Sequence, residues 1–277
     1  MPTTALVLAL CAAFVHAAWN LLLSRARDTE AATAVALVAG TLAFAPVAAA
    51  TWQVGARALP YAAGSAAFEL LYLSLLARAY QAGELSVVYP LARGSSPLLV
   101  LVFSVALLGA SLDTLATVGV CLVAGGLLLV RGQRGRAAPR DVRMGLAIGV
   151  CIASYTLLDK QGLKHAHPLP YLELVVGIPA LLYLPLLTRR RGTRALGAEL
   201  RAPSIVAGLG MFGAYALVLA AIRLAPASSL AAVQAVRETS VVIAVVLAHV
   251  ILGERVTRPR VAGAAIVVAG VAAIAAA

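Results

Sequence analysis

Charged side chains are scarce in this chain of 277 residues. Asp, Glu, Lys and Arg make up 12% of it, whereas hydrophobic residues make up 62%. A soluble domain contains about 25% charged and about 45–50% apolar residues, so this chain has too few polar side chains to cover a water-facing surface. The mean hydropathy of +0.96 agrees with that conclusion. The composition excludes a soluble globular protein and indicates an integral membrane protein.

Cysteine is also rare, and catalytic motifs are missing. Cys11, Cys121 and Cys151 lie singly inside apolar runs, which is typical of small buried hydrophobic residues and not of disulfides or metal ligands. The sequence has no His-Glu-x-x-His, Gly-x-Ser-x-Gly, P-loop or dinucleotide-binding glycine motif. We therefore predict no enzyme activity, no catalytic residue, no cofactor and no bound metal. Without a P-loop, any transport would be driven by an ion or solute gradient.

The net charge of +11 could suggest a nucleic-acid-binding protein. The arginines, however, lie between apolar runs and do not follow one face of a helix, which is how membrane proteins place them. The expected partners are therefore a lipid bilayer and a small-molecule substrate, with protons as a candidate coupling ion and no nucleic acid. The oligomeric state stays open between a monomer and a homodimer.

Ten apolar runs are long enough to cross a membrane, for which about 20 residues are needed. They occupy approximately residues 3–23, 31–51, 59–80, 85–108, 114–130, 144–163, 171–187, 204–223, 228–252 and 256–276. Only helices and closed barrels satisfy every backbone polar group in lipid, and these runs lack the alternation of barrel strands. The first run has no basic residue ahead of it, which favours a retained span over a cleaved signal peptide.

Two stretches of the chain repeat each other at an offset of 144 residues. The offset pairs Arg93 with Arg237, Ser96 with Ser240, Leu108-Gly109 with Leu252-Gly253, Gly119 with Gly263, and Gly126 with Gly270. A unit of five helices begins and ends on opposite sides of a membrane, so a second copy is inverted relative to the first. Inverted repeats are typical of transporters that open a midplane site alternately to either side. The predicted fold is all-α, with ten transmembrane helices as two inverted five-helix repeats. The repeats would span residues 1–132 and 143–277, joined by a basic linker at 133–142.

Three segments resemble the EamA-type members of the drug/metabolite transporter superfamily. Residues 226–257, with the glycines and valines of 263–271, resemble the closing segment of those proteins. Residues 95–126 are similar to it more weakly, and residues 14–20 resemble their Trp-bearing first helix. The resemblance implies a ten-helix secondary transporter of small metabolites, commonly an exporter of amino acids or related solutes.

Polar side chains inside the spans are the candidate substrate-binding residues, because a charge at the bilayer centre costs about 2.5–3.5 kcal/mol on insertion scales. Glu69 could carry a proton or bind a cation, or it could pair with a buried arginine. Arg93 and Arg237 could bind carboxylate or phosphate, or neutralise an acid, Arg237 through Glu238 or Glu69. The full predicted set is His16, Trp19, Asn20, Glu69, Tyr89, Arg93, Tyr155, Gln234, Arg237 and Glu238.

Other residues in the spans receive structural interpretations. Asp159 and Lys160 would pair with each other or reach the lipid headgroups. Pro90 and Pro97 would distort the fourth span around Arg93. Gly119, Gly126, Gly263 and Gly270 would allow close helix packing.

We expect a secondary active transporter, an exporter or exchanger, of a small polar metabolite such as an amino acid or organic anion. A proton-coupled exporter of organic cations and a channel-like facilitator remain alternatives. The expected location is the bacterial inner membrane. The connections after the odd-numbered spans hold 16 Lys and Arg, and those after the even-numbered spans hold 4. Because cytoplasmic loops carry the excess, this count predicts external termini, whereas the family resemblance implies cytoplasmic ones.

Overall fold

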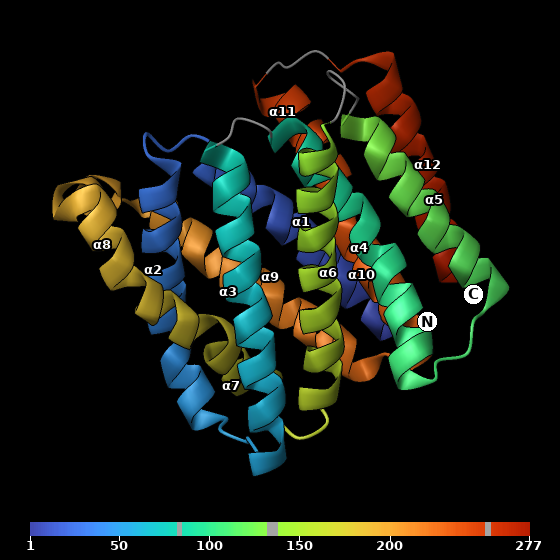
Figure 1. The fold of residues 1–277 in the computed structure, drawn as a ribbon, viewed down its shortest axis with the longest axis horizontal. Coiled ribbons are helices and arrows are strands. Elements are labelled where there is room, and N and C mark those ends of the chain that lie inside the picture. The colour runs from blue at the N-terminus through green and yellow to red at the C-terminus, as the bar shows by residue number, and fades with distance from the viewer. Residues whose placement is uncertain (82–84, 132–137, 253–255) are drawn as a thin grey trace.

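The computed structural model describes residues 1–81, 85–131, 138–252 and 256–277. Its long helices stand together in one bundle (Figure 1). The first half consists of α1 (Thr3–Leu23), α2 (Thr29–Ala50), α3 (Leu59–Gln81), α4 (Leu85–Leu108) and α5 (Thr114–Arg131), with a 3-10 turn η1 (Ala56–Ala58) before α3. The second half consists of α6 (Pro139–Gly162), α7 (Pro168–Leu172), the π-turn η2 (Glu173–Gly177), α8 (Ile178–Glu199), α9 (Ala202–Leu224), the 3-10 turn η3 (Ala227–Ser229), α10 (Leu230–Glu238), α11 (Ser240–Leu252) and α12 (Arg258–Ala276).

The all-helical membrane architecture predicted from the sequence is confirmed. Within the described residues, nine helical stretches are long and apolar enough to cross a membrane. A further apolar helix, Thr114–Val130, is shorter. The β-structure in the described part of the chain is one isolated bridge between Val54 and Ala166.

The seventh span is interrupted earlier than predicted. Pro179 and Pro185 lie inside the seventh apolar run of the sequence and predict interruptions there, but the π-turn over Glu173–Gly177 precedes both prolines. Pro179 has no N–H to bond the carbonyl four residues before it, and its ring crowds that carbonyl. Widening of the preceding turn relieves this crowding. A second kink follows at Gly192, whose φ of +78° suits glycine.

The predicted ninth span is confirmed as one apolar span over Ala227–Ile251, within which α10 ends at Glu238 and α11 begins at Ser240. Thr239 lies at the break, where its hydroxyl donates to the carbonyl of Val236 at 2.7 Å. Such local bonds compete with the helical ladder. The distortion predicted for the fourth span does not break the helix, since α4 continues through Pro90 and Pro97.

Helices α5 and α12 cross where glycines face each other. A Cβ on Gly119 would lie 2.7 Å from the carbonyl oxygen of Gly270, and one on Gly126 would lie 2.7 Å from that of Gly263. The lower-numbered glycine of α5 meets the higher-numbered glycine of α12, so the two helices are antiparallel. The predicted role of these glycines in close packing is confirmed.

The predicted burial of the cysteines is correct only for Cys151, since Cys11 and Cys121 are exposed. Both lie on apolar helices, and an apolar side chain needs no protein cover where lipid surrounds the bundle.

Backbone hydrogen bonds join two of the connections at one end of the bundle. The C-terminal ends of α1, α3, α5 and α11 lie at the top of Figure 1, and those of α2 and α6 lie at the bottom. At the bottom, the backbone N–H of Gly55 donates to His165 at 2.9 Å, and that of His167 donates to Gln53 at 2.8 Å. These bonds join the α2–α3 connection to the α6–α7 connection.

Candidate functional site

A cavity of about 900 Å³ lies inside the bundle. Residues of α1, α2, α3, α4, α6, α8, α9 and α10 line it. Ser24, Arg27 and Asp28 of the α1–α2 connection also line it, so the cavity reaches the upper end of the bundle. At the other end, none of the described residues of the α2–α3 or α6–α7 connection lines it. Within the described residues, the cavity therefore opens toward the end of the bundle where α1 joins α2.

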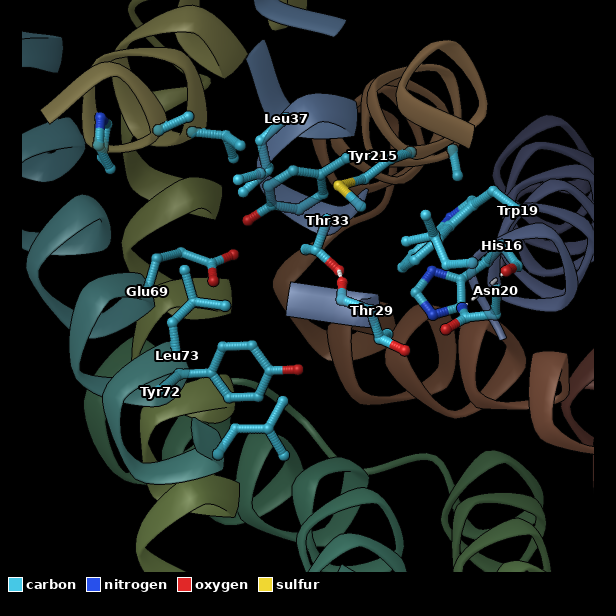
Figure 2. Close-up of a pocket in the computed structure, with 18 of the residues that line it drawn as sticks. His16, Trp19, Asn20, Thr29, Thr33, Leu37, Glu69, Tyr72, Leu73 and Tyr215 are labelled. Carbon is cyan, nitrogen blue, oxygen red and sulfur yellow. Dashed lines mark hydrogen bonds between the residues drawn. The ribbon is translucent and has the colours of Figure 1, made fainter. Parts of the chain in front are cut away.

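Opposite walls of the cavity carry different polar groups. Figure 2 shows Glu69 and Tyr72 of α3 facing His16 and Asn20 of α1 across the cavity. Tyr215 of α9 points its hydroxyl toward Glu69 in the same view. The carboxylate of Glu69 thus lies on the wall away from α1, among tyrosines.

Arg93 on α4 is neutralised by an acid from the other half of the chain. Its Nη1 lies 3.0 Å from both carboxylate oxygens of Glu238, which is fully buried. Its Nη2 lies 3.4 Å from Nε2 of His16, and its guanidinium sits 5.2 Å from the centre of the Tyr89 ring. Arg93 is only 7% exposed. Because a buried charge needs a partner, Glu238 compensates the charge of the Arg93 guanidinium in this buried position.

Arg237 on α10 lines the same cavity without an acid. Among the described residues, no carboxylate lies within ion-pair distance of it. Its Nη1 donates to the hydroxyl of Tyr155 at 3.5 Å, and its guanidinium lies 5.6 Å from the centre of the Tyr215 ring. Its Nε is buried and has no acceptor within the described part of the chain. The alternative of a direct ion pair from Arg237 to Glu238 or Glu69 is therefore not seen, although the charge of Arg237 interacts with both carboxylates over a longer distance.

Gln234 and Glu238 were predicted to bind substrate, but neither lines the cavity. The amide of Gln234 donates to Glu238 at 2.9 Å and to the hydroxyl of Ser96 at 3.3 Å. Both residues are buried between α10 and α4. Their geometry orients the carboxylate that holds Arg93.

The other eight predicted residues lie together on the cavity wall: His16, Trp19, Asn20, Glu69, Tyr89, Arg93, Tyr155 and Arg237. The rings of His16 and Trp19 meet edge to face, with centroids 4.7 Å apart. The indole Nε1 of Trp19 is buried without an acceptor in the described residues. Trp19 and Arg237 therefore each keep one buried donor without an acceptor among the described residues.

Sequence reasoning missed Tyr72 and Tyr215, which line the cavity beside Glu69. A signal for Tyr215 was present. Gly64 of α3 packs on Leu158 of α6, and Gly210 of α9 packs on Trp19 of α1. The contact between α3 and α6 therefore resembles the contact between α9 and α1. The offset of 146 residues between these glycines pairs Glu69 with Tyr215.

Asp159 and Lys160 neither pair with each other nor reach the surface, contrary to the prediction. Asp159 is fully buried and accepts hydrogen bonds from Ser65 at 2.5 Å and Tyr215 at 3.2 Å. The ammonium of Lys160 donates to the carbonyls of Ile222 at 2.8 Å and of Ala225. Adjacent residues on a helix point in different directions, which explains why these two bind different neighbours.

Metal binding has no support in the described residues, where no three His, Cys, Asp or Glu side chains gather. The cavity offers aromatic rings, hydroxyls, one unneutralised guanidinium and one carboxylate. This combination can hold a small polar molecule by hydrogen bonds and charge.

Comparisons with known proteins agree with this architecture. The model of the EamA-like transporter family matches residues 3–132 and 142–276. The chain belongs to the EamA-like transporter family. As an EamA-like protein it is a multi-pass integral membrane transporter of the drug/metabolite type, which lies in a lipid bilayer and binds small substrates.

A solved structure entitled "Crystal structure of protein" has a TM-score of 0.73 to this EamA-like chain at 17% identity. The similarity covers 99% of this chain and 96% of that one. At this identity it shows the fold alone. None of the curated proteins compared with the chain matches it.

Proposed function

We propose that the chain is a secondary active transporter of a small solute that carries a carboxylate or a phosphate. The observation that carries the proposal is Arg237, which lines the cavity with no carboxylate within ion-pair distance among the described residues. A guanidinium charge at a cavity wall needs a partner, so an anionic group of a ligand is the expected one. Arg is also the preferred side chain for planar anions.

Glu69 would bind a positive group of the same solute, which makes a zwitterion such as an amino acid a suitable substrate. It lies on the wall of α3, whereas Arg237 enters from α10. A molecule with both charges would neutralise both side chains at once. An organic anion would use Arg237 and leave Glu69 with its hydroxyl neighbours.

Alternating access would come from two inverted five-helix repeats, residues 1–132 and 143–277. The antiparallel glycine contacts support this arrangement, because exchanging Gly119 with Gly263 and Gly126 with Gly270 leaves the pair of contacts unchanged. The two family matches divide the chain at nearly the same place. Rocking of one repeat against the other would move the opening from one face to the other.

The open face would be cytoplasmic. The α1–α2 connection at that face is one of the odd-numbered connections, which together hold 16 of the 22 Lys and Arg residues of the sequence, and cytoplasmic loops hold the excess of these residues. Both termini would then lie outside. A C-terminal reporter that is active only in the cytoplasm should stay silent, and activity would reverse the assignment. Location in a bacterial inner membrane stays a prediction.

Counterflow in liposomes tests the transport proposal. Liposomes holding the purified chain are preloaded with unlabelled amino acids, organic anions or cationic dyes, and uptake of the labelled compound is followed. A carrier gives faster uptake when the same compound is inside, whereas a facilitator shows no such stimulation. Acceleration by cationic dyes alone, unaffected by Arg237→Met, would favour the exporter of organic cations instead.

A further inference from the structure

Asp159 is a carboxylate that the cavity does not use. It lies on α6 one turn beyond Tyr155, is fully buried and does not line the cavity. Ser65 donates to its Oδ1 at 2.5 Å, and Tyr215 donates to its Oδ2 at 3.2 Å. Both donors are neutral hydroxyls.

No cation compensates this carboxylate within the described residues. The groups that face it are Ser65 and Glu69 from α3, Tyr171 from α7 and Tyr215 from α9. The ammonium group of its neighbour Lys160 instead donates to backbone carbonyls at the C-terminal end of α9 and just beyond it. An ionised carboxylate in such surroundings would be uncompensated, which costs several kcal/mol in a low-dielectric interior. A bound proton removes that cost and supplies an additional donor.

Asp159 lies between the cavity and the end of the bundle where the α2–α3 and α6–α7 connections meet. Tyr215 lines the cavity and also bonds Asp159, so its hydroxyl links the two. On the far side, Lys160 fixes α6 to the end of α9 through the carbonyls of Ile222 and Ala225. If α6 and α9 separate to open that face, Asp159 becomes exposed to the opposite solution.

We propose that Asp159 is the proton-binding residue that couples transport to a proton gradient, separate from the substrate site at Arg237 and Glu69. The inference rests on the proposed transport function. A hydronium ion in the cavity gives a proton to the oxygen of Tyr215 and becomes water, while Tyr215 gives its own proton to Oδ2 of Asp159. When the opposite face opens, that O–H bond breaks and the proton passes to water there. Asp159 and Tyr215 return to their starting states.

A proton fits the site better than a metal ion does. The two carboxylate oxygens already accept hydroxyl hydrogen bonds. No second carboxylate, histidine or cysteine joins Asp159 in a metal-binding group among the described residues. Sodium dependence is therefore an outcome that would contradict the proposal.

Infrared difference spectroscopy tests proton binding directly, with no substrate required. The reconstituted full chain is taken through a pH range, and the carbonyl band of a protonated carboxylic acid is followed. We expect a pH-dependent band that disappears in Asp159→Asn and persists in Glu69→Gln. A band unchanged in Asp159→Asn, or removed by sodium at constant pH, would overturn the assignment.

Transport gives the second measurement, with a panel compound that shows counterflow. A gradient of about one pH unit supports about tenfold accumulation for each proton exchanged. Asp159→Asn should keep counterflow but lose this accumulation, and accumulation equal to that of the unsubstituted chain would contradict the proposal. If Asp159→Asn loses both counterflow and accumulation, the Asp159→Glu variant is measured next. Recovery of both activities by Glu supports a proton-binding role, and failure to recover them counts against it.

If no compound shows counterflow, the transport function fails, while the infrared band still decides whether Asp159 binds a proton. The two failures are therefore distinguishable.

Discussion

Arg93 and Arg237 occupy equivalent places in the sequence repeat but meet different surroundings. Arg93 is held by both oxygens of Glu238 at 3.0 Å and is buried. Arg237 contacts Tyr155 and Tyr215, with no carboxylate in ion-pair distance among the described residues. One arginine is part of the packing between α4 and α10, and the other is available to the cavity.

The two arginines have different surroundings because different residues follow them in the sequence. Arg237 is followed by Glu238, whereas Arg93 is followed by Gly94. Glu238 points away from its own neighbour and reaches across to Arg93, because adjacent helical residues do not face each other. Gly94 instead packs on Leu128 of α5 and provides no acid for Arg237. One acid between two equivalent arginines leaves one positive charge for a ligand.

The largest effect should follow from removing the acid. Glu238→Ala leaves Arg93 charged and buried without its partner, and we expect a loss of about 3–5 kcal/mol in the free energy of unfolding. Unfolding of the purified chain in mild detergent, followed by circular dichroism, measures it. Arg93→Met with Glu238→Met should recover most of the stability, since a buried ion pair replaced by apolar residues is often neutral. Equal losses in the single and double variants would contradict the pairing.

The second prediction removes the other arginine. Arg237→Met should change stability little but weaken binding of an anionic panel compound by about tenfold to about a hundredfold, since hydrogen bonds to charged groups contribute about 1.5–3 kcal/mol. Binding is measured by the concentration dependence of counterflow. Arg57→Met, at an exposed arginine in η1, is the matched control. Unchanged affinity in Arg237→Met would mean that the free guanidinium does not contact substrate.

The third prediction concerns the crossing of α5 and α12, where glycines from the two halves of the chain make equivalent contacts. A Cβ on Gly119 or Gly270 would meet the other residue's carbonyl oxygen at 2.7 Å. Gly119→Ala and Gly270→Ala should therefore destabilise the chain by similar amounts, about 1–3 kcal/mol for an overpacked contact. Gly125→Ala, on the same helix with open space around its Cβ position, should be neutral or stabilising by about 0.5–1 kcal/mol. Thermal unfolding of the three variants compares them, and a harmless Gly119→Ala would refute the close crossing.

The helices were predictable from the sequence because crossing lipid demands long apolar segments, which composition reveals directly. The glycine contacts were predictable because small residues recur at one offset. The break at Thr239 was not, since no proline or glycine marks it and the competing hydroxyl bond is local. The partner of Glu238 depends on how α4 meets α10, which sequence spacing does not specify. Asp159 was misread because its neighbour Lys160 suggested a pair.

The smallest predicted effect concerns an ion pair outside the membrane-spanning segments, in contrast to the buried pair of Arg93. Glu199, at the end of α8, accepts from the backbone N–H groups of Arg27 and Asp28 at 3.1 Å each and from Arg201 at 2.8 Å. Burial alone would raise the pKa of Glu199, but these hydrogen bonds and the Arg201 charge outweigh it and lower that pKa.

Because the folded-state pKa of Glu199 lies below its unfolded value, its stabilising contribution is present above the unfolded pKa of about 4.3. It is lost as the pH falls through the folded value. Glu199→Gln should therefore lower the unfolding temperature at pH 7 by only a few degrees, because the Arg201 side chain is 43% exposed and screened by solvent. The difference from the unsubstituted chain should shrink as the pH falls below about 4.3. A difference that grows toward acid pH would show that Glu199 stabilises the connection as a neutral acid, and not through its charge.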